Sequence, residues 1–277
     1  MEKKYKLTEE TIKVNGSILH RIEALKDFCD VKKGYKGGFI ENEENLSQSG
    51  DCWVYDDAMV FGNAAVCGNT IVRGDAMVYD NAEVYDDAKV FGNAQVCGNA
   101  KVYEDARIYG NAKVYEDARI YGNTKVYHNA AVCGNTRIYG NAIVRGDAVV
   151  GGDAVVGGDA EIYDNAKVFG NAEVFGNAEI RGNAEIASNS DYIVFKNWWS
   201  SGRYFTWTKN NNMWKVGCFY GTGEQLIEKA YKDSELSGRE YEKVVVYVNS
   251  IKANEYDHVR KNIKERLLLK IRKLFGK

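Results

Sequence analysis

The chain has 277 residues, with 28 glycines, no proline and 45% apolar residues. Average usage would supply roughly a dozen prolines, so collagen, proline-rich linkers and proline-rich recognition tails are excluded. The net charge of −2 is unevenly spread, at −1 in residues 1–52, −8 in 53–190 and +7 in 191–277. This asymmetry favours two surfaces with different partners over uniform nucleic-acid binding.

No run of apolar residues is long enough for a membrane span, so none is expected. The first residues, MEKKYKLTEETIKVNG, lack the apolar region of a secretory signal. Six cysteines show neither CxxC pairing nor zinc-ligand spacing, which favours free thiols in a reducing compartment. We therefore expect a cytoplasmic location.

Residues 1–40, including KLTEETIKVNGSILHRIEAL, predict short strands and turns that form an N-terminal cap. A solenoid needs such a cap because its end coil exposes unpaired strand edges. The repeat register begins at about residue 41. Its first two hexads carry polar Asn42 and Gln48 at the strand position, so they predict a degenerate first coil.

Residues 53–190 repeat with a period of six, without insertion, over 23 hexads. The second position is Val or Ile in all 23 hexads, and the fifth is Asn or Asp in all 23. The sixth is Ala in 19, Thr at 70, 124 and 136, and Ser at 190. Inward β-branched residues, a small second inward residue and a Gly/Asn-type turn predict a solenoid. A three-sided coil would take 18 residues; a two-sided coil of 12 is the alternative.

The 23 hexads would then form just under eight coils, stacked about 4.8 Å apart into a prism roughly 37 Å long. The repeat resembles that of hexapeptide-repeat proteins with a left-handed parallel β-helix, and the resemblance supplies the handedness. The expected fold class is thus mainly β: a β-helix over residues 41–190 with an N-terminal cap.

Residues 191–277 predict a small α+β C-terminal domain. YIVFKNWW, RYFTWT and MWKVGCF indicate three aromatic-rich strands, and Trp198, Trp199, Trp207 and Trp214 are expected in a compact core. A helix is predicted after Thr222, with one or two more over 238–252 and 254–275. The basic amphipathic tail 259–277 would dock on its own domain, pair in an oligomer, or contact anionic lipid or nucleic acid.

Residues 18 apart stack on successive coils, which predicts two outward aromatic columns beside basic columns. The candidate ligand-binding residues are Tyr85, Tyr103, Tyr121 and Tyr139 with Lys101, Arg119 and Arg137, and Tyr109 and Tyr127 with Arg107 and Lys125. Such columns could bind an anionic ligand, a nucleotide or nucleic acid. Alternatively, they stabilise the sheet. The charge of −8 over the array argues against general phosphate-backbone binding.

Two further surfaces carry predictions. Stacked carboxylates at one corner (Asp86, Asp87, Glu104 and Asp105) could bind a metal such as Ca²⁺, or be solvated turn residues. An apolar belt at Ile143, Val149 and Val155 could mediate self-association into a dimer or trimer, or reflect repeat duplication alone.

The best-known hexapeptide-repeat enzymes are acyltransferases, which commonly use a histidine base and a projecting loop. Here only His128 of the three histidines lies in the array, at a corner, and no loop interrupts the coils. A general base needs a positioned partner and shelter from water. We therefore expect no catalytic residue and no cofactor, with an acyl-CoA-dependent transferase as the alternative.

The segments YKLTEETIKVNGSILHRIEALKDF and GCFYGTGEQLIEKA, with YGNAxV repeats between them, resemble an uncharacterised hexapeptide-repeat family of phages, prophages and Firmicutes. This resemblance implies a β-helix in a phage setting and no reaction. The predicted function is a non-enzymatic binding or structural protein, homo-oligomeric, that sequesters a host factor, a nucleotide-type signal or another anionic ligand.

Overall fold

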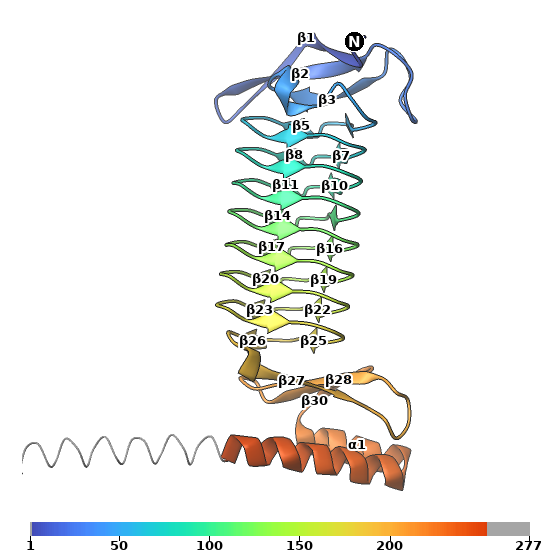
Figure 1. The fold of residues 1–277 in the computed structure, drawn as a ribbon, viewed down its shortest axis with the longest axis vertical. Helices are drawn as coiled ribbons and strands as arrows, with labels where there is room; N and C mark the ends of the chain where they lie inside the picture. The colour runs from blue at the N-terminus through green and yellow to red at the C-terminus, as the bar shows by residue number, and fades with distance from the viewer. Residues whose placement is uncertain (1, 254–277) are drawn as a thin grey trace, which may run out of the picture. The chain divides into compact units, whose positions relative to one another are not determined.

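The structure is a computed structural model that describes residues 2–253 and is mainly β (Figure 1). It divides into two compact units. The first contains the residues up to Phe195 together with Tyr204–Asn211, and the second contains Lys196–Arg203 and the residues from Asn212 on. The unit boundary therefore falls inside segment 191–277. No helix in residues 2–253 is long and apolar enough to cross a bilayer.

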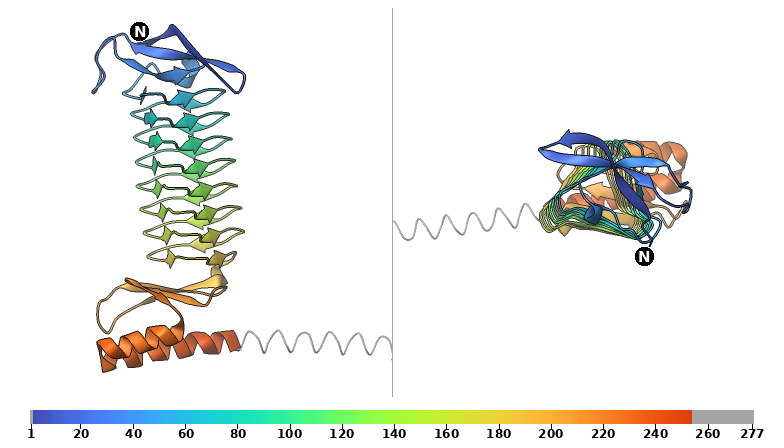
Figure 2. Two further views of the ribbon diagram at one scale, coloured as in Figure 1. Left: turned by 180° about the vertical axis from the view of Figure 1, so that it is seen from behind. Right: turned by 90° about the horizontal axis from the view of Figure 1, so that it is seen from above.

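The first unit is a parallel β-solenoid whose coils stack in order along the chain (Figures 1 and 2). Paired residues lie 18 apart, so each coil has three sides and the 12-residue alternative is wrong. Face 1 contains β5 (Met59–Val60), β8 (Met77–Val78), β11 (Gln95–Val96), β14 (Lys113–Val114), β17 (Ala131–Val132), β20 (Val149–Val150), β23 (Lys167–Val168) and β26 (Glu185–Ile186).

The other two sides have the same construction. Face 2 contains β6 (Ala65–Val66), β9 (Glu83–Val84), β12 (Lys101–Val102), β15 (Arg119–Ile120), β18 (Arg137–Ile138), β21 (Val155–Val156) and β24 (Glu173–Val174). Face 3 contains β4 (Trp53–Val54), β7 (Ile71–Gly74), β10 (Lys89–Gly92), β13 (Arg107–Ile108), β16 (Lys125–Val126), β19 (Ile143–Val144), β22 (Glu161–Ile162) and β25 (Glu179–Ile180).

Backbone N–H groups of each coil donate to carbonyls of the next coil along the chain. In the hexad that begins at Lys101, the N–H of Lys101 donates to Ala118 O at 2.8 Å and that of Tyr103 to Ile120 O at 3.0 Å. Corner residues make the same kind of hydrogen bond between coils: Asn69 N–H donates to Asp86 O at 2.7 Å. Proline would remove such a bond, which explains its absence from the array.

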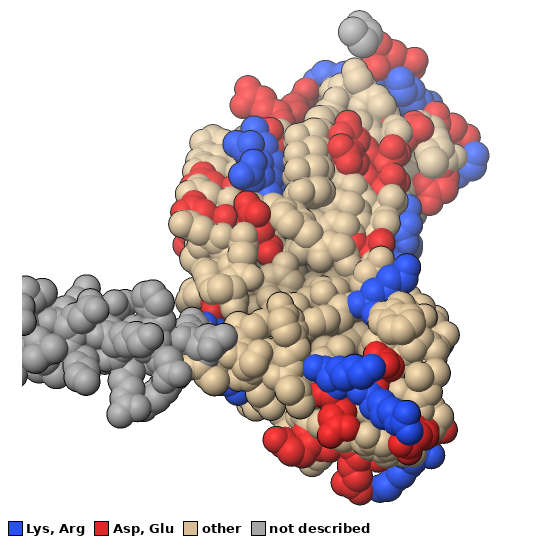
Figure 3. All heavy atoms as spheres, turned by 60° about the horizontal axis from the view of Figure 1, so that its bottom comes forward, with Lys and Arg blue, Asp and Glu red and all other residues tan. Residues whose placement is uncertain are grey.

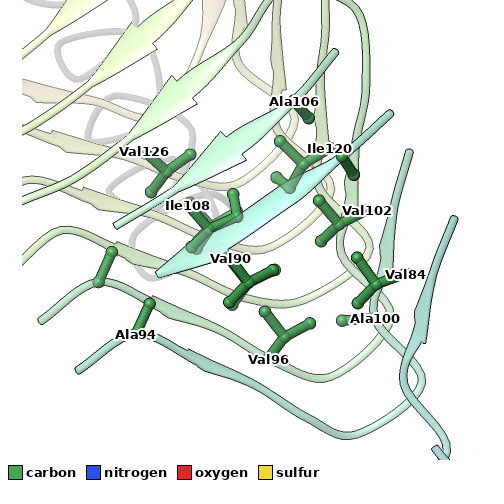
Figure 4. Packing of buried hydrophobic residues seen from close by; sticks show 14 of the residues in the cluster. Val84, Val90, Ala94, Val96, Ala100, Val102, Ala106, Ile108, Ile120 and Val126 are labelled. Carbon is green, nitrogen blue, oxygen red and sulfur yellow. The ribbon is translucent and has the colours of Figure 1, made fainter. Parts of the chain in front are cut away.

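The core is the narrow interior of the prism. Val or Ile of the second position and Ala of the sixth point inward and pack against the same residues of adjacent coils (Figure 4). Val84, Val102 and Ile120 succeed one another on face 2 and have no exposed surface. The corners need left-handed backbone: Gly134 has φ of 72°, and an added Cβ would lie 2.4 Å from Gly152 O.

Three inward threonines replace alanine in this core, and their hydroxyls are not equivalent. Thr70 Oγ1 donates to Cys67 O at 2.7 Å. The buried Oγ1 atoms of Thr124 and Thr136 have no hydrogen-bond partner among the described residues. An unpaired buried hydroxyl destabilises the folded state, whereas a paired one does not.

We therefore expect Thr136→Val to raise the free energy of unfolding by about 1 kcal/mol, because valine keeps the volume and removes the unpaired hydroxyl. Thr70→Val should lower it or leave it unchanged. Urea denaturation followed by circular dichroism would measure both. Equal destabilisation by the two changes would show that the Thr136 hydroxyl has a partner.

The first coil would leave carbonyl oxygens unpaired, and the N-terminal cap supplies their donors. The cap comprises β1 (Tyr5–Val14), β2 (Ser17–Ala24), β3 (Lys36–Ile40) and a 3-10 turn, η1 (Glu43–Asn45). The buried Lys4 Nζ donates to Gly50 O at 3.2 Å and to Cys52 O at 2.9 Å. Tyr5 Oη donates to Leu46 O at 2.6 Å.

In the last coil the strand N–H groups lack partners, because no further coil follows to supply carbonyl oxygens. Three side-chain oxygens accept from them: Asn189 Oδ1 from Glu173 N–H at 2.7 Å, Thr206 Oγ1 from Glu179 N–H at 3.0 Å, and Asn210 Oδ1 from Glu185 N–H at 2.9 Å. These residues belong to η2 (Asn189–Asp191), to β28 (Tyr204–Thr208), which lies beside β25, and to the loop after β28. β27 (Tyr192–Lys196) precedes them.

The second unit contains β29 (Met213–Val216), antiparallel to β30 (Phe219–Gly221), then α1 (Gly223–Asp233) and a helix over residues 235–253. The predicted N-cap is confirmed, since Thr222 Oγ1 accepts the Gln225 N–H at 3.4 Å. The expectation of one tryptophan core is wrong. Trp207 and Trp214 are buried in different units, and Trp198 is 73% exposed. The tail 259–277 lies outside the described residues.

Candidate ligand-binding surface

The tyrosine column on face 2 forms as the period predicts. The rings of Tyr85, Tyr103, Tyr121 and Tyr139 are stacked, with centroids 4.9, 4.9 and 5.4 Å apart in succession. Because each ring covers its neighbour's face, the two middle rings present only edges and hydroxyls. Burial raises the pKa of Tyr85 and Tyr103, so their hydroxyls stay protonated at neutral pH and can donate hydrogen bonds.

Face 3 carries the second column, of Phe91, Tyr109 and Tyr127. Their centroids lie 4.8 and 4.7 Å apart, with interplanar angles of 2° and 3°. His128 approaches Tyr127 edge-on at 4.7 Å. The middle ring, Tyr109, is thus covered on both faces. A nucleobase therefore has no free ring face on which to stack at the centre of either column.

The cations of the array fall into two classes. Five of its 11 Lys and Arg residues form ion pairs: Arg73 with Asp56, Lys101 with Glu83, Arg145 with Glu161, Lys167 with Glu185 and Arg181 with Asp164. The other six have no ion pair with any described residue. They lie together in the central coils: Lys89, Arg107, Lys113, Arg119, Lys125 and Arg137.

Stacking brings these cations into columns. Lys89, Arg107 and Lys125 are in register on three successive strands of face 3, and Arg119 is in register with Arg137 on face 2. Like charges one coil apart repel by on the order of 1 kcal/mol in water. An anion that bound along a column would remove this repulsion.

Two grooves run beside these columns at the corners of the prism. The Arg107 groove has a volume of about 340 Å³ and is lined by Asp105, Arg107, Asn123, Lys125, Asn141 and Ile143. The Arg119 groove has a volume of about 240 Å³ and is lined by Asp117, Arg119, Asn135, Arg137 and Asp153. In both, the lining residues lie 18 apart, so each groove extends along the stacking axis over three coils.

The amide and carboxylate wall of both grooves was not predicted as part of a binding site. Residues of this wall occupy the fifth position of each hexad, two residues before the basic side chain. Many fifth-position residues bond to one another along the axis, as Asn135 Nδ2 does to Asp153 Oδ1 at 2.9 Å. The same 18-residue spacing that revealed the basic columns would have revealed this wall.

The acidic corner is not assembled as a metal site. Asp87 Oδ1 accepts a hydrogen bond from Asn69 Nδ2 at 3.1 Å, and Asp86 Oδ2 accepts one from the Glu104 N–H at 3.4 Å. Within residues 2–253, no group of three or more His, Cys, Asp or Glu side chains is placed to hold a metal ion. Asp105 instead lines the Arg107 groove.

The apolar belt does not form a single patch. Ile143, Val149 and Val155 are half-buried and lie on faces 3, 1 and 2, because consecutive hexads occupy consecutive sides. They encircle the coil, and each face presents one of them. Their role in self-association stays a prediction.

The histidines do not form a base with an orienting partner in the described residues. His128 is an exposed corner residue with φ of 61°. No hydrogen bond of its ring is found within the described part of the chain. His20 Nδ1 lies 3.0 Å from Thr8 O in the N-terminal cap, and His258 lies outside the described residues.

Comparison with known proteins gives two short matches. A family model described as the YdcK beta-solenoid repeat matches residues 137–152. A protein of Escherichia coli K12 named "Uncharacterized acetyltransferase YdcK" is 38% identical over 66 residues, which cover 21% of this chain and 20% of the relative. The chain thus matches about a fifth of the relative's length. Together with the structure, these matches identify the chain as a β-solenoid repeat protein.

Proposed function

We propose that the protein is a non-enzymatic binding protein that holds an anionic ligand against the central coils of its solenoid. The observation that carries this proposal is the segregation of cations. Four of the five paired cations lie outside residues 89–137, and five of the six cations between residues 101 and 137 have no ion pair within the described residues. Unpaired stacked cations are unfavourable by themselves, and a bound anion offsets their repulsion.

The surroundings of the cations agree with this function. Tyr103 and Tyr109, whose pKa is raised by burial, lie on the same two faces as the cations. The grooves provide amide groups that donate hydrogen bonds. Charge-assisted bonds from guanidinium and ammonium groups are about twice as strong as neutral ones. Figure 3 shows basic and acidic side chains in small separate groups on the displayed side, and not in one broad basic field. Because residues 53–190 have a net charge of −8, the site suits a slender anion better than a nucleic-acid duplex.

Heparin-affinity chromatography tests this proposal, since heparin is a general polyanion. The wild-type chain should be retained at low salt despite its pI of about 6.0. Arg107→Gln/Lys125→Gln should elute at markedly lower salt. Lys167→Gln/Arg181→Gln removes the same charge from paired cations and should elute like the wild type, because its cations already have carboxylate partners. Equal shifts by both double variants, or no retention of any protein, would contradict the proposal.

A second candidate is acetyl transfer, which the name of the Escherichia coli relative favours. In this chain the reaction would depend on His128, the array's histidine. Binding of acetyl-coenzyme A that His128→Ala abolishes would support the transferase. The exposed position of His128 and the lack of an orienting partner among the described residues favour the binding protein.

The proposal also includes four more specific predictions about the protein's setting and assembly. They are a phage or prophage setting, sequestration of a host factor or nucleotide-type signal, a cytoplasmic location and assembly into a dimer or trimer. Light scattering on the purified chain would measure the assembly state.

A further inference from the structure

We infer that the ligand of the Arg107 groove is a base-free, linear phosphate polymer such as inorganic polyphosphate, lying parallel to the solenoid axis. This inference rests on the proposed anion-binding function and adds the ligand's class and direction. Three observations carry it: the direction of the groove, the chemistry of its walls and the covered faces of the aromatic rings.

The direction follows from the repeat. Asp105, Asn123 and Asn141 form one wall of the groove on three successive coils, and Arg107, Lys125 and Ile143 form the other. Lys89 continues the basic column one coil towards the N-terminus, in register with Arg107. One cation per coil recurs along the axis with the spacing of stacked strands, about 4.8 Å. A linear polyanion aligned with the axis meets three cations, whereas one wrapped around the coil leaves the groove.

The two grooves differ in what their walls can still bind. In the Arg119 groove, Asp117 and Asp153 place two carboxylates beside Arg119 and Arg137, and Asn135 already donates to Asp153. The Arg107 groove has one carboxylate, that of Asp105, against Arg107 and Lys125. Asn123 makes no side-chain hydrogen bond to any described residue and lines the groove with both cations. The Arg107 groove therefore has the larger excess of unused donors.

Phosphate fits these donors because each unit of the polymer has two non-bridging oxygens. One can accept from the Arg or Lys wall while the other accepts from the Asn wall. Bases would add nothing at the middle of the adjacent column, since Tyr109 is covered on both faces by Phe91 and Tyr127. Single-stranded nucleic-acid binding normally gains much of its affinity from base stacking on free aromatic rings.

The test is equilibrium binding of labelled polyphosphate to the full chain, by fluorescence anisotropy. A chain of several tens of phosphates should bind at least tenfold more tightly than tripolyphosphate. Arg107→Gln and Lys125→Gln should each weaken binding about three- to tenfold. Lys167→Gln is the matched control, because Lys167 already pairs with Glu185 at 3.2 Å, and its loss should change the affinity less than twofold. Lys113 lies one hexad after Arg107 on face 1, between Gln95 and Ala131, so Lys113→Gln should weaken the binding of an axial ligand less than Arg107→Gln does.

A double-mutant cycle tests the direction. If the ligand is axial, the effects of the Arg107 and Lys125 substitutions on binding free energy should be non-additive. If the ligand wraps around one coil, the non-additive pair should be Arg107 and Lys113. Asp105→Asn should strengthen binding two- to threefold, because it removes the only carboxylate of the groove lining. If flexible polyphosphate releases counterions as single strands do, three contacts give a slope of about −2 for log K against log salt, and Arg107→Gln about −1.4.

The outcomes separate the two proposals. Heparin retention that depends on Arg107 and Lys125, without tighter binding of long polyphosphate, would overturn this inference and leave the proposed function intact. An oligonucleotide of equal charge that binds more tightly than polyphosphate would overturn the base-free assignment. Weakening by Lys113→Gln as large as that by Arg107→Gln would overturn the axial direction. Absence of binding to every polyanion would overturn both proposals.

Discussion

Combining Asn189→Ala, Thr206→Val and Asn210→Ala should lower the free energy of unfolding by about 3 kcal/mol, or about 1 kcal/mol for each lost hydrogen bond. These three side chains accept the strand N–H groups of Glu173, Glu179 and Glu185 in the last coil. Without them, three backbone donors have no partner at the end of the ladder. Urea denaturation of the full chain would measure the loss.

Amide hydrogen exchange locates the same effect. Exchange at residues 173, 179 and 185 should accelerate in the triple variant, while exchange in central coils changes little. Asn171→Ala is the control, since no hydrogen bond of its side chain is found within the described residues. Unchanged stability and exchange in the triple variant would show that other groups close the last coil.

Ile120→Ala should cost about 2–5 kcal/mol of unfolding free energy, because it leaves a cavity in the narrow core. Ile120 has no exposed surface and lies in register between Val102 and Ile138. The packing of the adjacent coils limits how far the surrounding side chains can move into the cavity. Ile120→Val, which removes one methylene, should cost about 0.5–1.5 kcal/mol.

Thermal and urea denaturation of the two Ile120 variants would check this order. A cost below about 1 kcal/mol for Ile120→Ala would mean that the interior closes around the missing atoms. The account of a rigid, close-packed prism would then be wrong at this coil.

The repeat itself could be predicted from sequence because each position has one physical task. The invariant Val or Ile, the small sixth residue and the turn pair give the three faces, the inward side chains and the aromatic columns. The coil closures could not be predicted this way. Most of them depend on single side chains outside the repeat, such as Lys4 and Asn210, whose partners lie far away in the sequence.

The binding site, too, could be predicted from the sequence only in part, because some of its features depend on individual neighbouring side chains. Columns follow from the 18-residue period, but the ion pairing within a column depends on neighbours. Lys101 is paired because Glu83 precedes it by one coil, so Lys101 is a weaker ligand candidate than Arg119. Stacking of the rings on one another, which covers both faces of the middle rings, depends on side-chain conformation and not on spacing.

The central claim is that the unpaired cations of the middle coils bind an anion, and one ratio tests it most directly. It is the Kd of a labelled heparin oligosaccharide for Arg107→Gln/Lys125→Gln divided by its Kd for Lys167→Gln/Arg181→Gln, at one salt concentration. Both variants lose two positive charges. The account predicts a ratio of about ten or more, since each lost contact is worth roughly 1 kcal/mol. A ratio near one would show that only net charge matters, and would contradict the account.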